Sequence, residues 1–383
     1  MLAIFLAALA NVIGLGVIVP LLPYFALHYG ADAFEAAMLF SIFSLAQFLT
    51  APLWGRLSDR IGRKPIILIS FAGSALGYVW LAFADGLFMI YMARIFSGAM
   101  NGWLATSQAY VADVTDEEGR AKGMGMLGAA FGLGFIFGPA LGGYLAGADV
   151  INYQLPMLVA AGGSAIAFAL SAFLLRAPER HKGGALSAVS FLPQLRLVPV
   201  LWLLILLYFG LFFVFSGMES TLALWCEAVL NMGPRQVGYY LAFAGICGVI
   251  VQGGIVGRLV PRLGEAKVII IGLVCLAVGL GGLPLVSFEI WLLLPIALLS
   301  IGFGFANPSL QSLISRAAPH DMRGGTMGVA QSANSLGRIT GHAWGGVAFV
   351  GLGVGWPFYS GAILVLPVLF ATIVLSRRVK PGT

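Results

Sequence analysis

Four ionisable residues lie inside long apolar segments of this 383-residue sequence: Arg94, Glu219, Arg338 and His342. An ionisable side chain at membrane depth is costly and commonly marks a substrate or proton pathway. A carboxyl group in an apolar environment, such as that of Glu219, can take up and release a proton near neutral pH. Arg338 and His342 are one helical turn apart and share a face, where they can hold an anionic group or pair with Glu219. Histidine can also titrate at physiological pH. We therefore predict a substrate or proton pathway along these residues.

Each of these residues also has a purely structural interpretation, which the sequence leaves open. Arg94 could bond to neighbouring backbone, Glu219 could serve as the partner of an arginine, and His342 could make no more than one hydrogen bond between helices. Neutral amides form a second set, which can line a cavity or tie helices together. Aromatic residues such as Tyr208 are interpreted as packing. The amides are Asn11, Gln47, Asn101, Gln108, Gln252, Asn307, Gln311 and Asn334.

Composition indicates that membrane helices position these residues. The chain is 60% apolar and 9% charged, whereas a soluble domain has about 25% charged residues. This composition excludes a soluble enzyme, a disordered chain and a nucleic-acid-binding protein. A bilayer core needs about 20 apolar residues per helix. We therefore predict an all-α membrane protein with twelve spans, at 2–27, 33–54, 66–84, 87–112, 122–147, 154–175, 199–228, 235–257, 267–287, 289–314, 324–350 and 356–375.

The basic residues predict the orientation of these spans. Most of the 21 Lys and Arg residues fall in loops on one side under a twelve-span count, and such loops are cytoplasmic. Both termini are therefore predicted to be cytoplasmic, and the net charge of +6 reflects topology. The three cysteines form no CxxC pair, so neither a metal site nor a disulfide framework is expected.

An internal repeat divides the chain into two halves. The segment GRLSDRIG at 55–62 recurs as GRLVPRLG at 257–264, and residues 120–143 share an Arg, a Met and five glycines with residues 323–346. An even number of spans lies between the copies, so the two halves are parallel repeats. We predict a six-helix bundle at 1–175, a polar linker at 176–198 and a second six-helix bundle at 199–383. This architecture is typical of secondary transporters whose substrate site lies near the middle of the membrane.

Four motifs resemble signatures of the major facilitator superfamily. Residues 55–64 (GRLSDRIGRK) resemble its loop 2–3 signature, and residues 132–143 (GLGFIFGPALGG) look like the helix 5 signature of its drug:proton antiporters. Residues 94–102 and 14–23 resemble the helix 4 and helix 1 signatures of the twelve-helix drug antiporters. The order and spacing are similar to tetracycline efflux proteins, densely over 1–147 and thinly over 199–383. The resemblance implies a role for Arg94 in proton transfer or substrate contact.

The resemblance further implies a gate at the cytoplasmic side. Asp59, Arg63 and Asp113 would form a charge cluster that latches the halves in one state, within a gating set of Gly55, Asp59, Arg60, Gly62, Arg63 and Asp113. Asp59 aligns with Pro261 in the second copy, so we expect the latch to be one-sided, with its acidic residue in the first half only. An interface-helix signature contains Gly134, Gly138, Pro139 and Gly142, whose glycines would let helices approach closely.

The sequence departs from tetracycline efflux proteins inside the membrane. Their acidic residues in helices 1, 3 and 9 correspond here to Asn11, Gly77 and a neutral stretch near Cys275. The remaining set of two arginines, one histidine and one glutamate suits an anionic or zwitterionic solute.

We expect a secondary active transporter in a bacterial inner membrane, which exports drugs or small amphiphilic solutes by proton-coupled alternating access. Its partners would be a small-molecule substrate and the lipid bilayer, with no nucleic acid and no cofactor besides a proton gradient, and it would function as a monomer. A carrier of an organic anion or zwitterionic metabolite is one alternative, and a non-transporting membrane sensor or scaffold is another. An intramembrane enzyme is not expected, because the sequence contains no HExxH or GxSxG motif.

Overall fold

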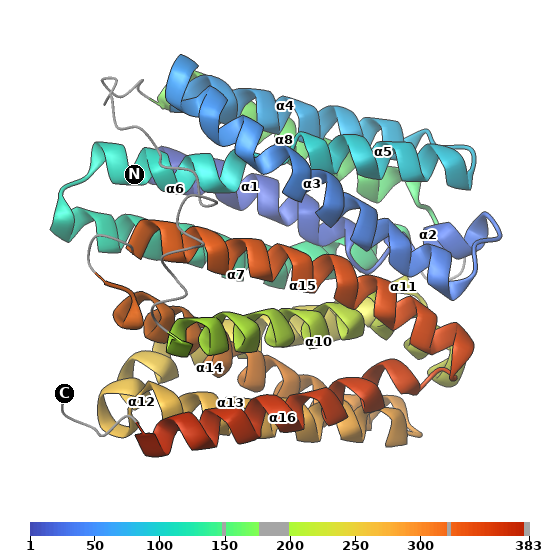
Figure 1. Ribbon diagram of the computed structural model, residues 1–383. Helices are drawn as coiled ribbons and strands as arrows, with labels where there is room; N and C mark the ends of the chain where they lie inside the picture. The colour runs from blue at the N-terminus through green and yellow to red at the C-terminus, as the bar shows by residue number, and fades with distance from the viewer. Residues whose placement is uncertain (148–150, 176–198, 320–322, 379–383) are drawn as a thin grey trace. The chain divides into compact units, whose positions relative to one another are not determined.

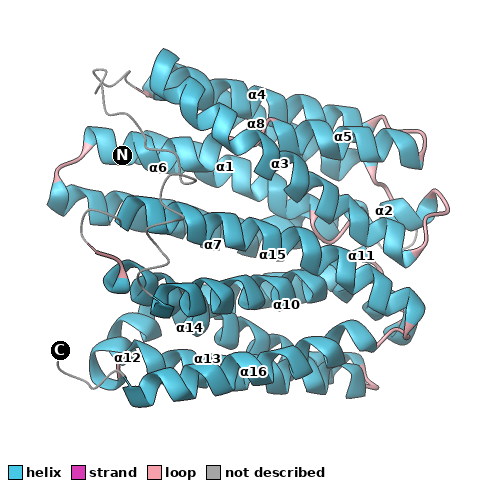
Figure 2. Cartoon of the chain, in the orientation of Figure 1, coloured by secondary structure: helices cyan, strands magenta, loops and turns pink. Residues whose placement is uncertain are grey.

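The computed structural model of the protein describes residues 1–147, 151–175, 199–319 and 323–378. Within these ranges the chain forms helices joined by short loops, and no β-strand is present (Figure 2). The helices before the predicted linker are α1 (Leu2–Ile18), α2 (Leu22–His28), α3 (Ala33–Ile61), α4 (Arg63–Ala82), α5 (Leu87–Ala99), α6 (Trp103–Val114), α7 (Glu117–Ala146) and α8 (Gln154–Leu174).

The helices after the predicted linker include one π-helical and two 3-10 segments. They are α10 (Pro199–Leu230), α11 (Pro234–Ile250), the π-helix η2 (Val251–Ile255), α12 (Val256–Leu263), α13 (Glu265–Gly282), the 3-10 helices η3 (Leu283–Leu285) and η4 (Glu289–Leu292), α14 (Leu293–Ala317), α15 (Arg323–Gly351) and α16 (Trp356–Arg378). Pro139 and Pro308 lie inside the continuous helices α7 and α14. Helix α14 thus continues through Asn307 and Pro308.

Ten helical stretches in the described ranges are long and apolar enough to cross a membrane. The chain is thus a multi-pass membrane protein. These stretches coincide with ten of the twelve predicted spans. The other two predicted spans are 324–350, which corresponds to the more polar helix α15, and 87–112. The count of twelve spans and the cytoplasmic location of the termini stay predictions.

The prediction of one continuous helix over 87–112 was wrong. The segment is divided into α5 and α6, with a break at 100–102. Breaking a helix leaves backbone carbonyls without their usual partners, and side chains of α3 supply replacements. Trp54 Nε1 donates to the Ala99 carbonyl over 2.6 Å, and Gln47 Nε2 donates to the Asn101 carbonyl over 3.4 Å. The break is therefore stabilised by donors from a neighbouring helix.

Contacts between helices divide the chain into two compact units. The first comprises Met1–Ala185 with Met232–Gly245, and the second comprises Leu186–Asn231 with Ile246–Thr383. The beginning of α11 thus packs with the first unit. The predicted linker at 176–198 lies outside the described residues, and the division into halves at 1–175 and 199–383 stays a prediction.

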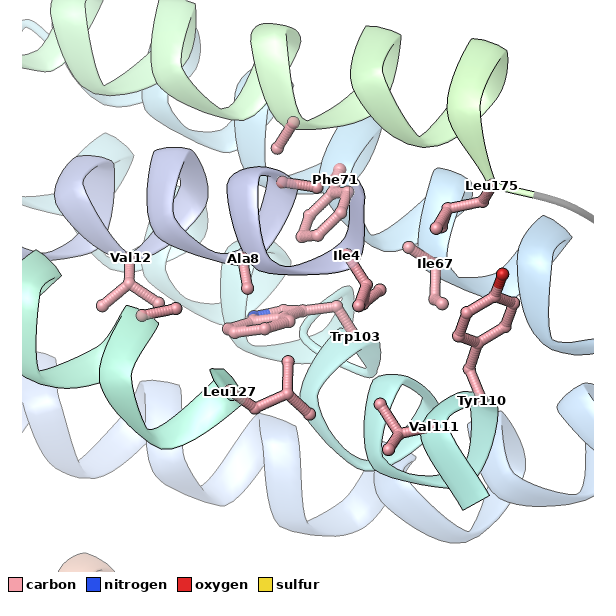
Figure 3. Close-up of a cluster of buried hydrophobic side chains, with 13 residues drawn as sticks. Ile4, Ala8, Val12, Ile67, Phe71, Trp103, Tyr110, Val111, Leu127 and Leu175 are labelled. Atoms are coloured by element: carbon pink, nitrogen blue, oxygen red, sulfur yellow. The ribbon is translucent and has the colours of Figure 1, made fainter. Parts of the chain in front are cut away.

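The first unit contains a core cluster built around Trp103 of α6 (Figure 3). The indole stacks on Phe131 of α7, with ring centroids 5.5 Å apart, and packs against Phe71 of α4 at 5.6 Å. Ile4 and Ala8 of α1 belong to the same cluster. Trp103 thereby holds α1, α4, α6 and α7 together, in agreement with its interpretation as a packing residue.

The same pattern of helix pairs recurs in each unit. In the first unit α1 packs along α7 and α8, and α4 packs along α8; in the second, α10 packs along α15 and α16, and α13 packs along α16 (Figure 1). The turn before α4 and the turn before α13 also share one conformation. Gly62 has a φ of 101°, and Gly264, which is its counterpart in the repeat, has a φ of 81°. This left-handed region favours glycine, which explains why both copies of the motif end in Gly.

Candidate functional site

The predicted charge cluster of the first unit is present at the start of α4. Arg63 Nη1 lies 2.5 Å from Asp59 Oδ1, and Arg63 Nε lies 2.9 Å from Asp113 Oδ2 at the end of α6. The Arg63 guanidinium also donates to Ser58 Oγ over 2.9 Å. Asp59 is thus paired with Arg63, and α4 begins without a side-chain cap. One guanidinium joins the ends of α3, α4 and α6.

The second unit contains an ion pair at the equivalent place. Arg316 Nη1, near the end of α14, lies 2.6 Å from Glu265 Oε1 at the start of α13, and Ser312 Oγ donates to the same oxygen over 3.3 Å. The repeat aligns Glu265 with Arg63 and Arg316 with Asp113, so the pair has the opposite polarity. Sequence reasoning missed this pair because it followed only Asp59 to Pro261. The signal was present, since Glu265 lies 202 residues after Arg63, like Gly264 after Gly62, and Arg316 lies 203 residues after Asp113, like Gly337 after Gly134.

Arg94 is buried inside the first unit, with 4% of its surface exposed. Its Nε donates to the Leu39 carbonyl of α3 over 3.3 Å, and its guanidinium lies 4.2 Å from the centre of the Phe43 ring. Its charge also acts on Tyr78 of α4. Arg94 therefore joins α5 to α3, and its positive charge is held among aromatic rings and backbone oxygens.

A small polar cavity lies nearby in the same unit. Its volume is about 10 Å³, which is room for about one water molecule. Asn101 lines it with a buried Oδ1 that has no hydrogen-bond partner. Asn11 also lines it, and Asn11 Oδ1 accepts from Ser164 Oγ over 2.9 Å. The structure thus brings two of the predicted amides together; the remaining lining residues are Leu15, Phe43, Ser74, Tyr78, Ser97 and Trp103.

Glu219 and Arg338 face each other in the second unit. Glu219 of α10 is half-buried, and the positive charge of Arg338 on α15 acts on its carboxylate. No hydrogen bond or ion pair within 4.0 Å is recorded for either side chain in the described part of the chain. The predicted proximity of a carboxylate and an arginine at membrane depth is therefore present, without a direct bond between them.

His342 is fully buried between α15 and α10. Its Nδ1 lies 2.8 Å from the Ser216 carbonyl, and because a carbonyl can only accept, Nδ1 carries the proton of this bond. The histidine therefore ties the two helices one turn away from Glu219. This position agrees with the structural interpretation that the sequence left open.

Two predicted amides of the second unit bond to one tyrosine, and a third bonds to one of these amides. Gln311 Nε2 of α14 donates to the Tyr208 hydroxyl over 2.8 Å and to Asn307 Oδ1 over 3.0 Å. The Asn334 side chain of α15 also hydrogen-bonds to the Tyr208 hydroxyl. Tyr208, which the sequence analysis treated as packing, is the centre of this group. We refer to Tyr208, Asn307, Gln311 and Asn334 as the amide cluster.

The glycines of the interface-helix signature pack α7 onto α1. Gly138 lies against Ile13 and Gly16, so closely that a Cβ on Gly138 would come within 2.7 Å of the Gly16 Cα atom. Gly134 faces Val12 and Gly142 faces Val17 in the same way. The second unit repeats this packing between α15 and α10, where Gly337 faces Phe209, Gly341 faces Phe213 and Gly345 faces Gly217.

Several predicted residues lie apart from these groups. Gly55 and Arg60 are exposed at the end of α3, and Gln108 is exposed on α6. Gln252 is exposed within the π-helix. In the part of the chain that the structure describes, no interaction with the charge cluster or the amide cluster is recorded for them.

Comparison with known proteins shows which family the chain resembles. The sequence model of the Major Facilitator Superfamily matches residues 4–342. The tetracycline resistance protein, class G, of Vibrio anguillarum is 33% identical over 377 residues, covering 93% of this chain and 92% of its own length. Multidrug resistance protein 2 of Bacillus subtilis (strain 168) is 28% identical over 387 residues, covering 98% and 96%.

A solved structure agrees with the family at the level of fold. The crystal structure of the human organic anion transporter MFSD10 (TETRAN) is similar with a TM-score of 0.73 and 24% identity, covering 97% of this chain and 98% of that one. The family match indicates a membrane transporter. The chain belongs to the Major Facilitator Superfamily.

Proposed function

We propose that this protein is a secondary active transporter that exports drugs or other small amphiphilic compounds in exchange for protons. The observation that carries the proposal is the arrangement of Glu219 and Arg338 within a transporter fold. Glu219 has no hydrogen-bond partner in the described part of the chain, so its proton can be exchanged without breaking a network. The relatives named for tetracycline and multidrug resistance support drugs as the substrate class.

Glu219 is proposed to carry the coupling proton, and Arg338 to favour its release. A carboxylate close to a positive charge is stabilised in its ionised form, whereas apolar surroundings favour the protonated form. A small change in the position of the Arg338 side chain, or in the access of water to Glu219, would therefore load or unload the proton. Alternating access would take place between the halves 1–175 and 199–383 of a monomer in a bacterial inner membrane.

Proteoliposomes with an imposed pH gradient test this function. A pH-sensitive dye reports whether lipophilic cations, zwitterions or organic anions collapse the gradient. We expect Glu219→Gln to abolish collapse of the gradient while substrate exchange continues. Glu227→Gln is the matched control, because Glu227 lies on the same helix but is exposed near its end. Collapse that persists in Glu219→Gln would contradict the assignment.

An organic anion carrier is the second candidate, and one observation favours it. Arg338 is partly exposed and makes no direct bond to a carboxylate in the described ranges, so it is available for an anionic group. Under this function Arg338→Ala would abolish transport of anions, whereas Glu219→Gln would leave their binding intact. Collapse of the pH gradient by cations alone would exclude the organic anion carrier.

A further inference from the structure

Three basic side chains gather at one end of the second unit. Arg258 and Arg262 lie on α12, and Lys267 lies in the first turn of α13. All three are exposed, and none of them makes a hydrogen bond or an ion pair with another residue in the described ranges. Helical residues four apart share a face, so Arg258 and Arg262 present two uncompensated positive charges together.

Another side of α12 is packed against its own unit. Leu259 and Val260 contact a cluster of Val251, Val268 and Phe305, and α12 lies beside α13 and α14 (Figure 1). The helix therefore has a basic exposed face and an apolar packed one. Because this packing holds the helix in place, the two arginines can bind a ligand with little loss of conformational entropy in the backbone.

Helix α12 ends a stretch that can span the membrane. The stretch Pro234–Leu263 is long and apolar enough to cross a membrane, and the next such stretch begins at Glu265. The turn at Gly264 therefore lies at a membrane surface, where long basic side chains extend to the lipid headgroups. Ile255 and Leu263 lie on either side of the arginines in the sequence and are 39% and 37% exposed. Apolar side chains at this depth can contact the acyl chains of the same lipid.

The equivalent helix end in the first unit carries a carboxylate that α12 lacks. There Asp59 is paired with Arg63, whereas the counterpart of Asp59 in α12 is Pro261. Glu265, the carboxylate nearest to α12 in the sequence, is already bonded to Arg316. In the described part of the chain, therefore, no carboxylate neutralises the basic face of α12. Such a face favours a ligand with a net negative charge over a zwitterion.

We propose that Arg258 and Arg262 form a binding site for the headgroup of an anionic phospholipid, whose acyl chains lie along Ile255 and Leu263. The lipid phosphate accepts hydrogen bonds from the two guanidinium groups, whose fork geometry suits phosphate oxygens. Lys267 adds a third positive charge at the same end of the unit. The site uses none of the residues proposed to carry protons or solute, so it does not depend on the proposed function.

Lipid retention by the purified full chain tests the site. The protein in detergent is mixed with equal amounts of dioleoyl phosphatidylglycerol and dioleoyl phosphatidylcholine, which share their acyl chains and differ in net charge. Native mass spectrometry counts the lipids that stay bound. We expect the first bound lipid to be phosphatidylglycerol about tenfold more often, and Arg258→Gln/Arg262→Gln to reduce this preference at least about fivefold. Arg56→Gln/Arg60→Gln, which removes the equivalent arginines of the first unit, is the control and should change it less than about twofold.

A second pair of variants isolates the effect of charge at one exposed position. Pro261→Asp gives α12 the carboxylate that the first unit has, and Pro261→Asn has nearly the same size without the charge. We expect Pro261→Asp to lower the preference for phosphatidylglycerol about threefold and Pro261→Asn to leave it unchanged. Equal preferences in these two variants, no preference in the wild type, or an equal loss in the arginine control would overturn the site. Displacement of the lipid by an excess of inorganic phosphate would also overturn it, because the site would then take free phosphate.

Discussion

Arg63 in the first unit and Glu265 in the second occupy the same place and carry opposite charges. Each begins a helix directly after a glycine with positive φ. Each is paired with a residue one position from the end of another helix, Asp113 in α6 and Arg316 in α14. The repeat has therefore kept the ion pair between the two helix ends while reversing its polarity.

The two polarities differ in how they interact with the helix dipoles. The N-terminus of a helix favours an acidic side chain and the C-terminus a basic one, each by about 0.3–1 kcal/mol. Glu265 and Arg316 follow this preference, whereas Arg63 and Asp113 oppose it. The first unit adds a second carboxylate, Asp59, to hold the arginine. We infer that the cluster of the first unit is the one poised to break, and that the pair of the second unit is a permanent tie.

The largest effect is expected from removing the arginine of the first cluster. Arg63→Ala leaves Asp59 and Asp113 without their partner, and hydrogen bonds to charged groups contribute about 1.5–3 kcal/mol. Gradient collapse in proteoliposomes should slow at least about tenfold. Arg56→Ala, an exposed arginine of the same helix end, is the control and should behave as wild type. Equal rates of gradient collapse for Arg63→Ala and Arg56→Ala would show that the cluster takes no part in the transport cycle.

A polarity exchange between the units should give an intermediate effect. The triple variant Asp59→Ala/Arg63→Glu/Asp113→Arg gives the first unit the arrangement of the second, in agreement with the dipoles. We expect a gain of about 1 kcal/mol in stability and turnover slowed about fivefold, measured by thermal unfolding and by gradient collapse. The reverse exchange, Glu265→Arg/Arg316→Glu, should lose stability and leave turnover nearly unchanged. If only the reverse exchange slowed turnover, the pair of the second unit would be the one that breaks, and the cluster of the first unit would be the permanent one.

The smallest effect is expected from the serines that accompany each pair. Ser58 is 2% exposed and accepts from Arg63 over 2.9 Å, whereas the bond from Ser312 to Glu265 spans 3.3 Å. Ser58→Ala should therefore cost about 1 kcal/mol and Ser312→Ala less than about 0.5 kcal/mol of unfolding free energy. Denaturant titration of the two variants in parallel decides the order. A larger loss for Ser312→Ala would mean that its bond to Glu265 contributes more than the bond between Ser58 and Arg63.

The features of the fold that depend on long apolar segments and on the internal repeat could be predicted from the sequence. Long apolar segments predicted ten of the spans, and the GRLSDRIG repeat identified the two equivalent segments in which the structure shows glycine turns at 62 and 264. The Arg63 cluster followed from the family resemblance. The break at 100–102 could not be predicted with the same means, because it depends on donors from Gln47 and Trp54, which are distant in sequence.

The sites could be predicted only in part, because the role of each residue depends on contacts between helices that the sequence does not show. His342 and Glu219 look alike as ionisable residues in apolar segments, but only the fold shows that the histidine is bonded to Ser216 and that the glutamate has no such bond. The sequence analysis overlooked the hydroxyl of Tyr208 for the same reason. An aromatic residue counts as apolar in a hydropathy pattern, and its hydroxyl becomes informative only when the fold places Gln311 and Asn334 beside it.

The glycine packing of α7 on α1 has a mechanical consequence. Gly138 leaves no room for a side chain against α1, because a Cβ there would come within 2.7 Å of the Gly16 Cα atom. The two helices are therefore closely packed along their glycines, and the same holds for α15 on α10. Because the packing is this close, we expect α1 with α7, and α10 with α15, each to move as one rigid body in any conformational change.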